Sequence, residues 1–139
     1  MAQQISEIMT ADPTTVTPQT PIVEVARLMR EEDIGDVLVA EGDRLRGLVT
    51  DRDLVVRAMA DARDVEATPV QDVYSTDLVT CSPDDDIEEA VRLMREHALR
   101  RLPVLHGEAL VGVVSLGDLA VERDRGSALG DISATEPNR

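Results

Sequence analysis

The sequence predicts a mixed α/β (α+β) fold made of two similar modules, and three observations lead to this prediction. A single offset of 65 residues aligns residues 5–54 with residues 70–119 without a gap, and 17 of the 50 aligned pairs are identical. In each copy an apolar pattern of helical period precedes two short apolar runs that a glycine-containing turn separates. The chain has 139 residues, enough for one compact domain or two very small ones.

Both copies open in the same way. A short polar and apolar segment leads into an extended stretch, which ends at Pro18 in the first copy and at Pro83 in the second. We expect the opening segments at residues 5–9 and 70–74, and the extended stretches at residues 14–17 and 79–82.

A helix is predicted next in each copy. Its start is marked by Thr20 before Pro21 in the first copy, and by Asp85 with Glu88 three residues later in the second, which is a capping-box spacing. The predicted buried faces are Ile22, Val25, Ala26 and Met29 in the first helix, and Ile87, Ala90, Val91 and Met94 in the second.

Two strands and a last helix complete each module. The strands are expected at residues 36–40 and 45–50 around the turn EGDR, and at residues 102–105 and 110–115 around the turn HGEA. The last helices begin near Asp51 and Leu116. Each copy is therefore a strand-helix-strand-strand-helix module. Because one such module is too small to bury a large core, we expect the two to pack as a pseudo-twofold pair with a cleft between them.

These elements divide the chain into four parts. The first module spans residues 1–60, a linker spans residues 61–68, the second module spans residues 69–123, and a polar C-terminal tail spans residues 124–139.

Composition excludes several classes of function. Tyr74 is the only aromatic residue, so the chain cannot form an aromatic platform for single-stranded nucleic acid. All fourteen basic residues are arginine, which removes Schiff-base lysines and the lysine of a P-loop. A net charge of -14 disfavours nucleic acid and anionic membranes as partners. No catalytic arrangement is recognisable, and we expect a protein that is not an enzyme.

Location and metal content are also predicted. A single cysteine, Cys81, cannot close a disulfide within the chain, and no signal peptide or membrane-spanning run is recognisable. We therefore expect a cytoplasmic protein without membrane insertion. His97 and His106 have no partner at a metal-ligand spacing, so no metal site is expected and no cofactor is required.

Three phrases carry a resemblance to a known family. RRLPV at residues 100–104, LVGVVSLGDL at residues 110–119 and RGLVTDRDL at residues 46–54 closely resemble the CBS domain family, and the chain is similar to the stand-alone bacterial CBS pairs of the hypoxic response type. The resemblance implies a regulatory Bateman module that forms a homodimer and controls a partner protein that the sequence does not identify. It also implies clefts for an adenosyl ligand: AMP, ADP, ATP, NAD or S-adenosylmethionine.

The resemblance also implies which residues bind this small-molecule ligand. In the family, a Ser or Thr three residues before an Asp contacts the ligand, with the Asp accepting both ribose hydroxyls. A preceding strand and an early extended stretch supply the other walls. The candidates in the second copy are Thr80, Cys81, Arg100, Arg101, Leu102, Ser115 and Asp118. Those in the first copy are Thr15, Val16, Val37, Thr50, Arg52 and Asp53.

Two alternatives remain open at this point. A Thr or Ser followed three residues later by Asp is also what an ordinary helix N-cap requires, so the clefts could be vestigial in a structural or interaction dimer. The two copies also differ in charge. Arg100 and Arg101 can neutralise a polyphosphate, whereas Asp36 beside Gly35 would repel one. If one cleft alone binds a nucleotide, we expect it to be the cleft that contains Asp118.

Overall fold

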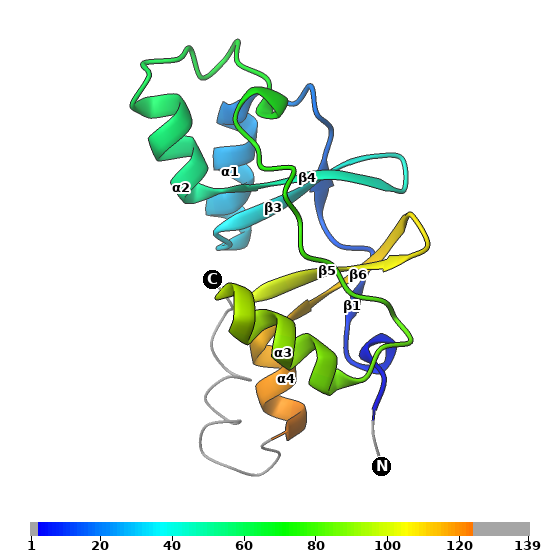
Figure 1. The fold of residues 1–139 in the computed structure, drawn as a ribbon. Helices are drawn as coiled ribbons and strands as arrows, with labels where there is room; N and C mark the ends of the chain where they lie inside the picture. Colours follow the sequence, from blue (N-terminus) through cyan, green and yellow to red (C-terminus); the bar gives the residue numbers. More distant parts are fainter. Residues whose placement is uncertain (1–2, 124–139) are drawn as a thin grey trace. The chain divides into compact units, whose positions relative to one another are not determined.

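The computed structural model describes residues 3–123, so the predicted tail at residues 124–139 lies outside the described residues. The fold is mixed α/β, as predicted, and the chain divides into two compact units (Figure 1). Of the described residues, unit 1 combines residues 3–13 with residues 79–123, and unit 2 is Thr14–Leu78. These units do not coincide with the two sequence repeats, because each contains the opening segment of the other copy.

Unit 2 contains a small sheet with its helices. Its strands are β2 (Thr15–Val16), β3 (Asp36–Glu41) and β4 (Arg44–Thr50), and β3 pairs in parallel with β2 and antiparallel with β4. An isolated bridge joins Leu48 of β4 to Ser75 on the other side of that strand. The helices are α1 (Ile22–Glu32), α2 (Asp51–Asp53), the π-helix η2 (Leu54–Met59) and the 3-10 helix η3 (Val70–Asp72).

Unit 1 repeats this arrangement. Strand β6 (Ala109–Ser115) pairs antiparallel with β5 (Arg101–His106) on one side and with β1 (Thr10–Ala11) on the other. Where unit 2 has β2, unit 1 has a single parallel bridge between Cys81 and Val104. The helices are the 3-10 helix η1 (Ile5–Glu7), α3 (Ile87–His97) and α4 (Leu116–Arg123), with α3 against β5 and α4 against β6.

The opening segments are exchanged between the two copies. The main-chain N–H of Ile5, from the first copy, donates to the carbonyl of Asp85 in the second at 2.9 Å. The main-chain N–H of Val70, from the second copy, donates to the carbonyl of Thr20 in the first at 2.8 Å. These two hydrogen bonds are equivalent under the 65-residue offset, so each copy completes the unit built around the other.

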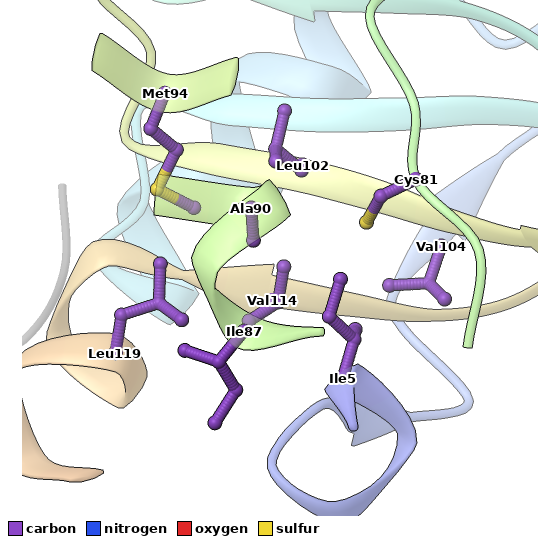
Figure 2. Close-up of a cluster of buried hydrophobic side chains, with 9 residues drawn as sticks. All are labelled: Ile5, Cys81, Ile87, Ala90, Met94, Leu102, Val104, Val114 and Leu119. Carbon is purple, nitrogen blue, oxygen red and sulfur yellow. The ribbon is translucent and has the colours of Figure 1, made fainter. Parts of the chain in front are cut away.

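The two hydrophobic cores show the same exchange. In unit 1, Ile5 points into a cluster that is otherwise built from the second copy (Figure 2). In unit 2, Val70 and Val73 are fully buried in a cluster that is otherwise built from the first copy. The remaining members of the unit 1 cluster are Cys81, Ile87, Ala90, Met94, Leu102, Val104, Val114 and Leu119.

Glycine is required at one position in each strand that receives an opening segment. A Cβ built on Gly47 of β4 would lie 2.3 Å from the Tyr74 ring and 2.9 Å from the main-chain oxygen of Ser75. A Cβ built on Gly112 of β6 would lie 2.6 Å from the Met9 sulfur. The absence of a side chain therefore lets the exchanged segments approach the sheet closely.

The predicted helix starts were wrong in both copies. Helix α1 begins at Ile22 with Pro21 as N-cap, and α3 begins at Ile87 with Asp86 as N-cap, and neither cap residue makes a side-chain capping bond. The side chains of the predicted caps instead accept hydrogen bonds from residues earlier in the chain. The Thr20 hydroxyl accepts from the Thr17 N–H at 3.1 Å, and the Asp85 carboxylate accepts from the Ser82 N–H at 2.9 Å. These side chains stabilise the turns before the helices.

One predicted core residue was also wrong. Ala26 is exposed, whereas Ile22, Val25 and Met29 of α1 are buried as predicted. Its equivalent in α3, Val91, is half-buried. The buried stripe of α1 is therefore narrower than the periodicity predicted, whereas Val91 of α3 packs partly buried against the unit 1 core.

The predicted linker packs on α1. The Val23 N–H donates to the Val65 carbonyl, the Ile22 N–H donates to the Thr68 carbonyl, both at 3.0 Å, and Thr68 is buried. The predicted hairpin turns are present, with Gly42 at φ +62° and Gly107 at φ +64°. Among residues 3–123, no helix combines the length and apolar character needed to cross a bilayer.

Candidate functional site

The candidate site of unit 1 lies where β6 ends and α4 begins. The Ser115 N–H donates to Oδ2 of Asp118, and the Asp118 N–H donates to the Ser115 hydroxyl, both at 3.1 Å. The two residues therefore form a reciprocal capping box. Oδ1 of Asp118 makes no hydrogen bond within residues 3–123, so one carboxylate oxygen stays available for a donor.

The candidate site of unit 2 has the same local geometry. Thr50 and Asp53 exchange the same two hydrogen bonds, both at 3.0 Å, at the junction of β4 and α2. Here the second oxygen of the carboxylate has a neighbour, because Oδ1 of Asp53 lies 3.7 Å from Nε of Arg57. Helix capping, one of the two open alternatives, thus occurs at both junctions. It leaves Oδ1 of each Asp without a hydrogen bond within residues 3–123, and an ion-pair partner stands near this oxygen in unit 2.

Each junction is tied to the residue just before the preceding strand. The Leu116 N–H donates to the Arg100 carbonyl at 2.7 Å, and the Asp51 N–H donates to the Gly35 carbonyl at 2.9 Å. Register places Arg101 opposite Ser115. The main chain therefore places Arg100 and Arg101 next to the Ser115–Asp118 pair, with Arg100 exposed and Arg101 half-buried.

The other predicted wall residues differ in how far their side chains are buried. The side chains of Val37 and Leu102 lie in the hydrophobic cores, and both residues pair with the neighbouring strand. Thr15 is exposed and Val16 half-buried in β2, while Thr80 is half-buried beside Cys81. Arg52 is exposed, and its main-chain N–H donates to Oδ1 of Asp51 at 2.8 Å.

Cys81 is oriented toward the core of unit 1. Its thiol lies 3.7 Å from the Pro103 carbonyl, and its main-chain N–H and carbonyl both bond to β5, at Pro103 and Leu105 (Figure 2). Burial first, and then the nearby carboxylates of Asp85 and Glu89, together raise the pKa of the Cys81 thiol to about 12. The thiol is therefore a protonated core group at neutral pH.

Alkaline pH is expected to destabilise the fold through Cys81. The folded thiol has a pKa of about 12 and the unperturbed thiol one of 9.0, so the unfolded chain loses this proton first as pH rises. The stabilisation is complete below pH 9 and is lost between pH 9 and 12. Urea unfolding should show the wild-type free energy of unfolding falling by about 1.4 kcal/mol per pH unit more than that of Cys81→Ala in this window. An equal fall in both proteins would contradict this.

Sequence reasoning gave no role to Asp51, although the motif that contains it was recognised. The signal that distinguishes it is the comparison of the copies, since Leu116 stands at the equivalent position. Within the described part of the chain, no three His, Cys, Asp or Glu side chains are grouped as a metal ion would need.

Comparison with known proteins places this geometry in a family. The family model of the CBS domain matches residues 5–59 and 70–124. The CBS domain-containing protein YhcV of Bacillus subtilis is 43% identical over 133 residues, which cover 93% of this chain and 94% of YhcV. Hypoxic response protein 1 of Mycobacterium tuberculosis is 33% identical over 115 residues, covering 82% of this chain and 80% of that protein.

Solved structures share the fold. A crystal structure of Hypoxic Response Protein I with two coordinated zinc ions matches with a TM-score of 0.78 and 32% identity, over 85% of this chain and 97% of that chain. The CBS domain pair of MJ0100, in complex with 5-methylthioadenosine and S-adenosyl-L-methionine, matches with a TM-score of 0.78 and 17% identity, over 91% of this chain and 100% of that chain.

Proposed function

The chain belongs to the CBS domain family, with two CBS domains in tandem, and from this premise we propose that it is a cytoplasmic regulatory module that binds an adenosyl ligand and controls a partner protein. The observation that carries the proposal is the Ser115–Asp118 pair, which leaves Oδ1 of Asp118 unbonded within residues 3–123. An ionised carboxylate accepts hydrogen bonds from the two hydroxyls of a ribose in the geometry that a charged acceptor favours.

The surroundings of this pair favour a phosphorylated ligand. Arg100 and Arg101 stand beside it, and arginine binds phosphate groups through several donors at once. A CBS pair of the same fold, that of MJ0100, holds two adenosyl compounds. We assign the same ligand class to this chain, with an affinity on the order of micromolar because no aromatic ring stacks on the base.

The decisive test compares two matched substitutions by calorimetric titration with AMP, ADP, ATP, NAD and S-adenosylmethionine. Asp118→Ala and Asp53→Ala each remove one capping box, so both are expected to lower the free energy of unfolding by about 1 kcal/mol. Binding of the nucleotide that the wild type prefers should weaken by about tenfold or more in Asp118→Ala alone, since hydrogen bonds to a charged acceptor are lost.

Two results would contradict this proposal. Equal effects of the two substitutions on binding would remove Asp118 as the ribose acceptor. No heat and no thermal shift with any of the five ligands at millimolar concentration would favour the alternative, an interaction module with vestigial clefts, for which the capping boxes are the supporting observation.

We also propose that the chain forms a homodimer through η2. Val55, Val56 and Met59 are 51%, 48% and 70% exposed on this short helix, and a second copy would remove them from water. Sedimentation velocity is expected to show a dimer for the wild type and a shift toward monomer for Met59→Asp, with Asp61→Asn as a control on the adjacent polar segment. A wild-type monomer at all concentrations would overturn this assignment.

A further inference from the structure

The first N–H groups of the helix differ between the two candidate sites. In unit 1, the Leu116 N–H is bonded to the Arg100 carbonyl and the Asp118 N–H to the Ser115 hydroxyl. Between them, the Gly117 N–H has no hydrogen-bond partner within residues 3–123. This N–H belongs to a residue without a side chain, so a ligand oxygen can approach it closely.

In unit 2 the chain itself fills the equivalent position. The N–H groups of Asp51 and Asp53 are bonded as their counterparts are, to the Gly35 carbonyl and the Thr50 hydroxyl. The Arg52 N–H, which corresponds to that of Gly117, donates to Oδ1 of Asp51 at 2.8 Å. A carboxylate from the chain thus bonds the donor that an anionic ligand group would need.

The second oxygen of Asp51 extends toward the preceding strand. A Cβ built on Gly35 would lie 3.3 Å from Oδ2 of Asp51, so this oxygen stands directly over the glycine. Unit 1 has Leu116 and Arg100 at the two equivalent positions, one uncharged and one cationic. Asp36, the first residue of β3, replaces Arg101 and adds to the reversal of charge.

We infer that Asp51 sets the ligand selectivity of the unit 2 site, which takes adenosine-type ligands whose 5′ end carries no negative charge and rejects their phosphorylated counterparts. This inference rests on the proposed function, because it presumes that the Thr50–Asp53 junction holds an adenosyl ligand. The negative charge of Asp51 repels a phosphate, and its hydrogen bond to the Arg52 N–H removes the main-chain donor that a phosphate would use. The two sites of one chain therefore bind two different classes of adenosyl compound.

The test measures adenosine and AMP binding to the full-length chain with Asp118→Ala, which weakens the unit 1 site, and compares the affinities before and after a further substitution at Asp51. In this background adenosine should bind more tightly than AMP by about tenfold, the effect of one close like-charge contact. Adding Asp51→Leu, which copies the unit 1 residue, should tighten AMP binding by about tenfold and leave adenosine binding within about twofold. Asp51→Asn keeps an oxygen that can accept from the Arg52 N–H but removes the negative charge. This variant should therefore show part of the increase in AMP affinity that is expected for Asp51→Leu.

The outcomes separate this inference from the proposed function. An unchanged ratio of AMP to adenosine affinity in Asp51→Leu, or equal binding of the two ligands before that substitution, overturns the selectivity role of Asp51. Absence of adenosine binding in the Asp118→Ala background also overturns it, even where the intact chain binds AMP through unit 1. If the intact chain binds none of the adenosyl ligands, the proposed function itself is contradicted, and so is the inference that rests on it.

Discussion

A fragment of residues 14–78 is expected to unfold in one cooperative transition, whereas a fragment of residues 1–65, of equal length, is expected to lack a cooperative fold. The first fragment contains all of unit 2, including η3 and the bridge from Ser75 to Leu48. The second contains the whole first repeat but lacks Val70 and Val73, which are fully buried in the unit 2 core.

The size of the effect follows from the missing burial. Burying one valine side chain contributes about 1.5–3 kcal/mol, so the two valines contribute about 3–6 kcal/mol. This is comparable to the total stability of a small domain, about 5–15 kcal/mol. Circular dichroism during heating distinguishes the fragments. A cooperative transition of similar midpoint in both would contradict the exchange of opening segments.

Replacement of Gly47 by alanine is expected to lower the free energy of unfolding by about 1–3 kcal/mol, the range for overpacking a tight contact. The new Cβ would lie 2.3 Å from the Tyr74 ring and 2.9 Å from the main-chain oxygen of Ser75, so the exchanged segment must move. Gly112→Ala is expected to act in the same way through Met9 and the main-chain oxygen of Thr10.

Gly35→Ala is the matched control for these substitutions. Its Cβ would approach only the carboxylate of Asp51, at 3.3 Å, which a flexible side chain can relieve. Combining Gly47→Ala with Tyr74→Ala should restore little, because the contact with the Ser75 oxygen remains. Urea denaturation measures all four proteins, and a Gly47→Ala chain as stable as Gly35→Ala would contradict the close approach.

The repeat made most of the fold predictable from sequence. Apolar positions at helical and strand spacing occur twice at one offset, so an ambiguous pattern in one copy can be interpreted from the other. The strands β3, β4, β5 and β6 all lie within a few residues of their predicted ranges. The helix starts were mispredicted because Thr20 and Asp85 are good capping residues by type. Their side chains instead accept from N–H groups three residues earlier, and side-chain type does not reveal that choice.

The motif of the candidate site could be predicted from the sequence, but the structural differences between its two copies could not. The spacing of Ser115 and Asp118, and of Thr50 and Asp53, identifies two equivalent junctions, and the structure places both pairs in the same capping geometry. Spacing does not reveal that Asp51 accepts from the Arg52 N–H, because the position of a residue in the motif does not fix where its side chain points. The sequences of the two opening segments also do not indicate which copy each segment joins, since both copies offer equivalent carbonyls to either segment.

The exchange of opening segments sets an order for folding during synthesis. Unit 2 is a continuous stretch of chain that ends at Leu78, so all of its parts are synthesised before the elements of unit 1 from α3 onward. Residues 3–13 are synthesised before unit 2, but they can pair with Asp85 and β6 only after those later residues have been made. Unit 2 is thus an insertion within unit 1, and the main-chain partner of Ile5 becomes available only after the whole of unit 2 has been synthesised.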